Sequence, residues 1–340
     1  MIQADRMQYG VSMWVCALAL MGLPMSVFAQ EAATEAAEIQ QKPAYRLETI
    51  PGDEVLGDFV VGPGKTELRL QPGETVTTEI LITNRTGESR VFNFETEDVV
   101  GTTGGDIAVK LLGDDRGPYS LRDYLEVPTE GIPLKHAERA RVPVTVSIPA
   151  DAEPGGLYGS VLVTTVTKDV ADTSSTNAVP KSPIVSRIGT LFFITVPGAI
   201  AYEGALQKFA TIPDASWFDG GPIHFELLYA NTGSVHVNPY GELSITNMFG
   251  EEVGFIEIEP WFALPQSLRF REVVWSREFL FGKYTATARI NRGYDDIIDE
   301  MDVTFWVLPW KVLLMVCVVV FMIVFLIRMF FTTFEFKRKV

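Results

Sequence analysis

Apolar and polar residues alternate one by one in a series of short segments from Phe59 onward. The clearest alternation covers residues 76–83, 142–148 and 188–196, and Pro, Gly, Asn or Asp residues bound each segment. A period of two is typical of strands with one buried face, and turn residues at this spacing favour a sandwich or a barrel. No sustained helical period occurs between residues 30 and 307. The pattern therefore predicts an all-β fold for this region.

The same order of features occurs twice along the chain. An early strand ends in Asn-Arg-Thr-Gly at 84–87, and a later strand at 223–229 ends in Asn-Thr-Gly at 231–233. In each half a Gly-x-Tyr sequence then enters a strand, with Tyr158 in the first half and Tyr284 in the second. This arrangement resembles the tyrosine corner of immunoglobulin-like domains. The repetition predicts two copies of one sandwich.

The C-terminal part has a different pattern. Residues from Val312 to Ile327 carry no charge, a cation brackets the stretch on either side, and two tryptophans precede it where an interfacial belt belongs. Basic residues outnumber acidic ones after the stretch, so the positive-inside rule places the tail in the cytoplasm and the large preceding part outside. We predict a single transmembrane helix at 308–330 and a cytoplasmic basic tail at 331–340.

The N-terminus predicts a signal peptide at residues 1–29. An apolar stretch from Val11 to Leu23 leads to Val-Phe-Ala at 27–29, whose small residues suit cleavage after Ala29. The positive charge before the stretch is weak, so an uncleaved anchor is the alternative. Residues 30–57 are rich in Ala, Glu and Gln and then loosely polar, which predicts a flexible segment.

These boundaries give a complete domain organisation. We expect the first immunoglobulin-like domain at 58–197 and the second at 198–307, followed by the transmembrane helix. The predicted fold class is all-β, with two tandem immunoglobulin-like β-sandwiches plus one transmembrane helix.

The charge of the chain limits the kinds of partner that we expect, and its cysteine content limits how the fold can be stabilised. The chain carries 43 acidic against 28 Lys and Arg residues, a net charge of −15. An acidic surface repels nucleic acid and anionic lipid, so neither is expected as a partner. The two cysteines, Cys16 and Cys317, lie in the predicted signal peptide and membrane helix. The part between them must therefore be held together by hydrophobic cores without disulfides.

Two polar inserts interrupt the first predicted domain. Residues 101–136 are rich in Gly, Asp and Pro, and residues 168–183 contain a run of Ser, Thr, Asn and Asp. Either insert suits a binding loop, and either also suits a solvated loop of no specific function.

Candidate chemistry is sparse. Of the three histidines, His224 and His236 fall on the outward phase of their strands and His136 lies in a loop, which favours surface positions over metal ligation. The acidic residues at 114–115 and 295–302 lack the spacing of an EF-hand loop, and neither a nucleophile elbow nor a P-loop occurs. We expect no enzymatic activity, no catalytic residue, no metal and no cofactor; a hydrolase with an unrecognised site is the alternative.

Two aromatic pairs in turn-like positions are the candidate ligand contacts. They are Trp217 with Phe218 and Trp261 with Phe262. Such rings can stack on sugars, or they can close the open ends of a sandwich.

The order of several short motifs resembles the WxL-interacting proteins, a family of Gram-positive bacterial surface proteins. In the first half they are Leu-Gln-Pro-Gly-Glu at 70–74, a strand ending at Asn84, and Ile-Pro-Ala-Asp-Ala-Glu-Pro-Gly at 148–155 leading to Tyr158-Gly159. In the second half they are Leu-Pro-Gln-Ser at 264–267, Phe-Gly-Lys-Tyr at 281–284, and Trp306 before the membrane helix and basic tail. The resemblance implies two immunoglobulin-like domains, the first associated with peptidoglycan and the second with partner proteins, on a bacterial plasma membrane.

The sequence thus predicts a non-enzymatic, membrane-anchored scaffold of the cell envelope that binds a cell-wall polymer or a surface protein. The alternative is an extracytoplasmic assembly factor or chaperone-like protein that binds partner strands by β-edge addition.

Overall fold

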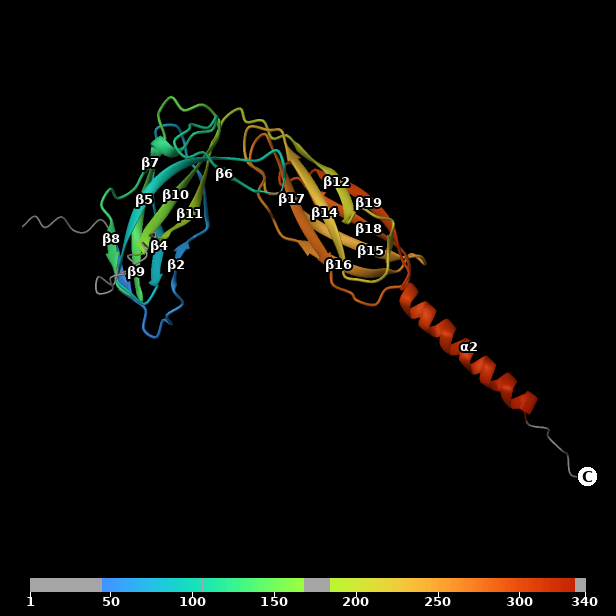
Figure 1. The fold of residues 1–340 in the computed structure, drawn as a ribbon. Helices are drawn as coiled ribbons and strands as arrows, with labels where there is room; N and C mark the ends of the chain where they lie inside the picture. The colour runs from blue at the N-terminus through green and yellow to red at the C-terminus, as the bar shows by residue number, and fades with distance from the viewer. Residues whose placement is uncertain (1–44, 106, 168–183, 334–340) are drawn as a thin grey trace, which may run out of the picture. The chain divides into compact units, whose positions relative to one another are not determined.

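The computed structural model of the protein describes residues 45–105, 107–167 and 184–333 (Figure 1). Within these residues nearly all regular structure is β-strand, and the one α-helix is the C-terminal α2 (Trp310–Thr333). The prediction of an all-β fold with a single apolar helix is confirmed. Residues from Tyr45 onward form one compact unit. The predicted signal peptide at 1–29 and the insert at 168–183 lie outside the described residues.

The first half of the described chain forms two sheets. One has the order β1-β9-β4-β2 with β7 paired to β9, and the other has the order β3-β11-β10-β5-β6 with β8 paired to β5. The strands of the first sheet are β1 (Arg46–Thr49), β2 (Asp58–Gly62), β4 (Thr75–Arg85), β7 (Leu125–Glu126) and β9 (Glu138–Ser147). Those of the second are β3 (Lys65–Arg69), β5 (Arg90–Val100), β6 (Lys110–Leu111), β8 (Ile132–Leu134), β10 (Gly155–Thr167) and β11 (Ile184–Val196).

The alternation seen in the sequence builds the core between these sheets. In β9, every second residue is an apolar side chain that is fully buried, namely Ala140, Val142, Val144 and Val146. They pack in one cluster with apolar residues of the other sheet, including Phe92 and Phe192. Successive side chains of a strand point to opposite faces, so this register leaves the polar residues between them on the outer face.

The chain crosses from one sheet to the other between β2 and β3. β2 pairs antiparallel with β4, whereas β3 pairs parallel with β11 over residues 191–195. Pro63 lies between the two strands, and its missing N–H prevents the β2 ladder from running on. The short β3 therefore covers only part of the length of β11.

The second half repeats the two-sheet plan with a core of its own. Its sheets have the orders β12-β14-β17 and β13-β19-β18-β15-β16. The strands are β12 (Gly204–Ile212), β13 (Trp217–Phe218), β14 (Ile223–Asn231), β15 (Tyr240–Asn247), β16 (Glu252–Ile258), β17 (Ser267–Trp275), β18 (Gly282–Asn291) and β19 (Ile298–Val307). Phe225, Tyr229 and Phe305 are among the fully buried side chains of its core. We call the two halves the first and second sandwich; β11 ends at Val196 and β12 begins at Gly204, so the predicted boundary at 197/198 falls in the connection.

Part of the predicted flexible segment at 30–57 is ordered. Arg46–Thr49 form β1, which pairs antiparallel with β9 and sets Arg46 opposite Arg141. The Arg141 guanidinium also binds the Glu48 carboxylate. The prediction of flexibility is wrong for these residues. Their sequence alternates little, but all four pair with residues of β9, whose apolar side chains are buried.

Helix α2 extends slightly beyond the predicted span. It continues to Thr333, so the first residues of the predicted basic tail at 331–340 are helical. Residues 334–340 lie outside the described part of the chain. The window Trp310–Phe330 has a mean hydropathy of 3.0 and is long and apolar enough to cross a membrane, and none of it is buried against the rest of the chain.

Candidate partner-binding edge

One edge of the first sandwich has no strand beside it. β10 and β11 pair along their whole length, from Gly155 opposite Val196 to Thr167 opposite Ile184. On its other side, β11 pairs with β3 only at residues 191–195. Among the residues that the structure describes, no strand pairs with this side of Ile184–Thr190. We call this segment the open edge.

The backbone of the open edge presents unused hydrogen-bonding groups. The Leu191 N–H donates to the Gly64 carbonyl at 3.0 Å, so odd-numbered residues of β11 point their backbone groups away from β10. Backbone direction alternates residue by residue in a strand. The N–H and C=O groups of Val185, Arg187 and Gly189 therefore face outward at the open edge, where an incoming strand can pair with them.

The open edge lacks the usual protection of edge strands. Natural edges are blunted by charged side chains or by proline, which discourage pairing with another chain. Residues 184–190 contain one charge and no proline. The Val185 side chain is 60% exposed, whereas the half-buried Ile188 packs against the core of the first sandwich. The segment thus carries little of the charge or proline that would discourage pairing with another chain.

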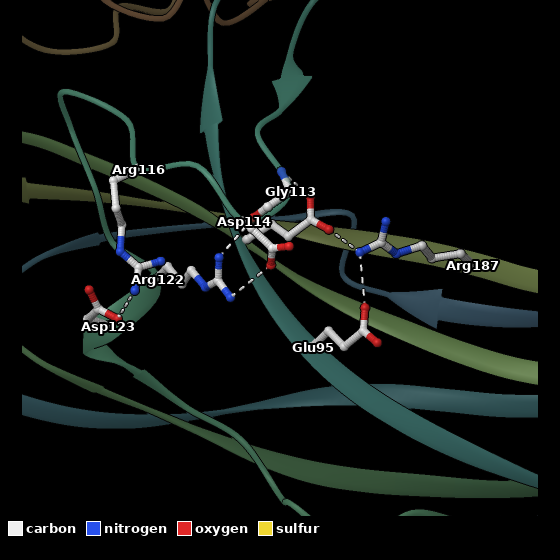
Figure 2. Close-up of polar contacts among 8 residues, drawn as sticks. Glu95, Gly113, Asp114, Arg116, Arg122, Asp123 and Arg187 are labelled. Carbon is white, nitrogen blue, oxygen red and sulfur yellow. Dashed lines mark hydrogen bonds and ion pairs between the residues drawn. The ribbon is translucent and has the colours of Figure 1, made fainter.

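The single charge of this segment is already neutralised. The Arg187 guanidinium lies 3.1 Å from the Glu95 carboxylate and also binds Glu97, both on β5 (Figure 2). The Glu97 side chain is almost fully buried and accepts a hydrogen bond from the Gly113 N–H at 3.0 Å. The Arg187 side chain therefore lies along the outer face of the sheet, toward β5, and does not protect the open edge from pairing with another strand.

The same charged network orders part of the insert at 101–136. The Arg122 guanidinium donates to the Gly113 carbonyl at 2.9 Å and lies 3.8 Å from Asp114 (Figure 2). Arg116 pairs with Asp123 at 2.6 Å, on the same stretch of chain. These contacts fix the loop next to β5.

A buried carboxylate anchors this loop. The fully buried Asp98 accepts hydrogen bonds from the backbone N–H groups of Gly117, Leu121 and Arg122, at 2.9 to 3.1 Å. Burial alone would raise the pKa of Asp98, but the Ser120 hydroxyl and the three N–H donors outweigh it and lower the pKa. Asp98 therefore stays ionised and acts as a structural anchor.

The two sandwiches meet at a small aromatic cluster. The Tyr158 hydroxyl accepts a hydrogen bond from the backbone N–H of His236 at 2.6 Å, and the two rings lie edge to face. Tyr158 and Phe193 of the first sandwich also pack with Leu264 of the second. The prediction that His236 lies on the surface is wrong, because its side chain is only 8% exposed. His236 is also not on a strand: it lies in the connection between β14 and β15, and residues of the first sandwich cover it.

Charged groups border this cluster. The Glu67 carboxylate lies 3.8 Å from the His236 ring nitrogen and 2.5 Å from the Lys65 ammonium. Contact with His236 and Lys65 outweighs partial burial and lowers the pKa of Glu67 to about 2. The Lys65 ammonium also lies 5.1 Å from the centre of the Phe262 ring.

The insert at 101–136 also reaches the second sandwich. The backbone N–H groups of Leu268 and Phe270 in β17 donate to the carbonyls of Thr102 and Gly105, at 2.9 and 3.0 Å. This short stretch occupies the edge of β17 as an added strand would. The insert at 101–136 therefore connects the first sandwich to the second at this point.

The four aromatic candidates occupy different environments. Trp261 is only 4% exposed and packs edge to face on Tyr229 in the second core, so it offers no surface to a ligand. Phe262 joins the aromatic cluster between the sandwiches, and Phe218 packs partly buried against Phe305. Only Trp217 is well exposed, stacked on Trp306 at 5.5 Å. The structure does not bring the two pairs together in one site.

The two remaining histidines have different surroundings. His224 is exposed and lies 2.6 Å from Glu272, and His136 is half-buried in its loop. Within 45–105, 107–167 and 184–333 no group of three or more His, Cys, Asp or Glu side chains is placed to hold a metal ion.

Two important features were not identified in the sequence. The open edge depends on where β3 begins along β11, which alternation within β11 does not reveal. The role of Tyr158 was also missed, although a Gly-x-Tyr sequence marked the residue. The relevant signal is the difference in length between β3 and β11, because a strand of five residues cannot cover one of 13.

Comparison with known proteins gives distant similarity only. No family model and no curated protein matches the chain. Among solved structures it is similar to the class 5 fimbriae chaperone CfaA, at 10% identity and a TM-score of 0.35, covering 73% of this chain and 99% of that one. It is also similar to the E. coli chaperone DraB, at 12% identity and a TM-score of 0.33, covering 72% and 96%. The Pseudomonas aeruginosa CupB2 chaperone gives 9% identity and a TM-score of 0.31, covering 72% and 100%. Likeness at this level transfers neither an activity nor a partner.

Proposed function

We propose that this protein is a membrane-anchored extracytoplasmic binding protein that captures an extended segment of a partner protein on the open edge. The partner segment adds to β11 as a further strand, pairing with the outward backbone groups of Val185, Arg187 and Gly189. Main-chain hydrogen bonds supply affinity in such β-augmentation, and alternate side-chain positions supply specificity. The open edge alone carries this proposal.

The anchor is helix α2. The 21 residues of Trp310–Phe330 span about 31 Å at a helical rise, which matches the ~30 Å hydrocarbon core. The basic residues after the span and the predicted signal peptide both favour a large extracytoplasmic part and a short cytoplasmic tail. We therefore place the open edge outside a bacterial plasma membrane, on a single-pass protein.

The proposed partner is another surface protein. The resemblance to WxL-interacting proteins would instead associate the first sandwich with peptidoglycan and the second with host or partner proteins. Binding of a cell-wall polymer stays a prediction, for which the exposed Trp217 is the remaining candidate contact. Absence of enzymatic activity is part of the proposal, because the edge acts through backbone groups without a nucleophile or an acid–base pair.

The test removes one outward N–H from the open edge. In Val185→Pro the lost donor faces away from β10, so the β10–β11 ladder keeps its hydrogen bonds, and edge positions tolerate proline. Val185→Thr is the matched control, because it keeps the N–H and a β-branched side chain. Full-length protein is isolated from the envelope in detergent, and co-purifying proteins are quantified.

Hydrogen exchange then locates the contact on the chain. In the free protein we expect the amides of Val185, Arg187 and Gly189 to exchange fast, and those of Ser186 and Ile188, which face β10, to exchange slowly. A bound partner should protect the fast set, and the complex should be lost in Val185→Pro and kept in Val185→Thr. A partner that binds Val185→Pro as well as the wild type would show that the open edge is not the binding site.

A further inference from the structure

The second sandwich has an unusually apolar end next to α2. In its larger sheet, Gly282 pairs with Val307 and Asn247 pairs with Tyr284, so the connections at 248–251 and 276–281 lie at the same end as the start of α2. β13 lies there too, because Phe218 pairs with Val307. We call these two connections, together with residues 213–222 around β13, the helix-side loops.

The helix-side loops expose large apolar side chains at their tips. Phe249 is 79% exposed, Phe279 71%, Trp217 61% and Phe281 57%. Met248 is also exposed. Isolated exposed apolar residues need no explanation, but a group of aromatic rings at one end of a domain marks an interaction surface.

The short connection to α2 determines what surrounds this end of the second sandwich. Only Leu308 and Pro309 separate β19 from α2, and two residues reach at most about 7 Å. The Leu308 N–H donates to the Phe218 carbonyl at 2.8 Å, and Lys311 in the first turn of α2 lies 2.9 Å from Asp219. These contacts hold the helix-side loops beside the point where α2 begins.

We propose that the helix-side loops insert their aromatic side chains into the interfacial layer of the bilayer, so that the second sandwich is seated on the membrane. This inference rests on the proposed membrane span of α2. The interfacial region extends about 5–7 Å beyond the hydrocarbon core on each side, which lies within reach of loops that start where the span starts. Trp is enriched in this layer, and both Trp and Phe are typical of the apolar faces that interfacial segments bury in it.

The charges of the loops predict which lipid is needed. The four acidic residues Asp214, Asp219, Glu251 and Glu278 outnumber Arg277, the one basic residue of the helix-side loops. The contact must therefore be driven by apolar insertion and not by attraction to anionic lipid. Seating should occur on zwitterionic phosphatidylcholine and should weaken, at low salt, when anionic phosphatidylglycerol is added.

The test measures depth in the bilayer on the full-length protein. Cys16 and Cys317 are replaced by Ser, and a nitroxide label is attached to Phe249→Cys or Phe279→Cys. The control is a label at Tyr240→Cys. Tyr240 pairs with Asn291, at the opposite end of the sheet. The proteins are reconstituted in phosphatidylcholine vesicles. Collision of the label with oxygen, which enters lipid, is compared with collision with a water-soluble nickel chelate.

We expect the oxygen-to-nickel collision ratio to be several-fold higher at positions 249 and 279 than at 240. A label on the native Cys317, in the middle of α2, reports the membrane span separately. A deep Cys317 label with water-exposed labels at 249 and 279 would overturn the seating alone, whereas a water-exposed Cys317 label would overturn the span itself. Loss of nickel access without gain of oxygen access would mean that another protein covers the loops, and would also overturn the seating.

Discussion

The hydroxyl of Tyr158 lies 2.6 Å from the backbone nitrogen of His236, which is 78 residues further along the chain. Tyr284, the counterpart of Tyr158 in the second half, instead directs its hydroxyl to the backbone of Phe281, three residues away. One motif thus closes a local corner in the second sandwich and joins two sandwiches in the first.

Removal of the Tyr158 hydroxyl should weaken the junction. Tyr158→Phe leaves the buried His236 N–H without its acceptor, at a cost of about 1–3 kcal/mol in the free energy of unfolding. Thermal unfolding of the full-length protein in detergent measures the loss. Tyr202→Phe, at an exposed tyrosine, is the control and should change little. Equal stability of Tyr158→Phe and wild type would show that the junction contributes nothing.

Acid should weaken the same junction through Glu67. The pKa of Glu67 is lowered from 4.5 to about 2 by its contacts with His236 and Lys65, so the ionised carboxylate favours the folded state. For an acid with a depressed pKa, this contribution is complete above the unfolded value and is lost as pH falls through the folded value. The Tm difference between wild type and Glu67→Gln should therefore be largest above about pH 4.5 and shrink toward pH 2. A difference that is constant over this range would refute the role of the carboxylate.

Asp98 should control the order of the insert at 101–136. Asp98→Asn keeps the size of the side chain but removes one acceptor oxygen and the charge, and we expect a loss of about 1–3 kcal/mol. Hydrogen exchange at Gly117, Leu121 and Arg122 should accelerate, because their N–H groups lose their common acceptor. Asp115→Asn, at an exposed residue of the same loop, should leave these amides unchanged.

The two tryptophans proposed as ligand contacts should behave differently. Trp261→Ala empties a buried position and should lower the free energy of unfolding by about 3–5 kcal/mol. Trp217→Ala removes an exposed ring and should lower it by about 1 kcal/mol or less. Unfolding of both variants is followed by tryptophan-independent circular dichroism. Similar losses would contradict the buried position of Trp261.

The alternation of residues was sufficient to predict the strands, but not what covers their outer faces. His236 was predicted on the outward face of a strand, but it lies in the connection between β14 and β15 and is buried against Tyr158 and Phe193 of the first sandwich. Contacts of this kind join residues far apart in sequence, and no local period reports them. The same limit applies to the β17 edge, which is occupied by Thr102 and Gly105 from the first half.

The candidate site was harder to predict than the fold. The strand at 188–196 was visible as alternation, but the open edge exists only because β3 begins opposite Leu191 and leaves the earlier residues of β11 uncovered. Trp261 occupies a turn-like sequence and is nevertheless buried, since composition near a turn does not decide which way a ring points. Register and side-chain direction depend on the partner strands, and these are set by the tertiary fold.

The connection between β19 and α2 is only two residues long, so it cannot lengthen much under load. A force that pulls the second sandwich away from α2 enters β19 directly from the helix, along the axis of the strand. β19 lies inside its sheet, between β13 and β18, and pairs with β18 over Ile298–Val307. Such a pull loads those hydrogen bonds together in shear instead of breaking them one at a time. The second sandwich is therefore connected so as to resist a pull between α2 and the sheet.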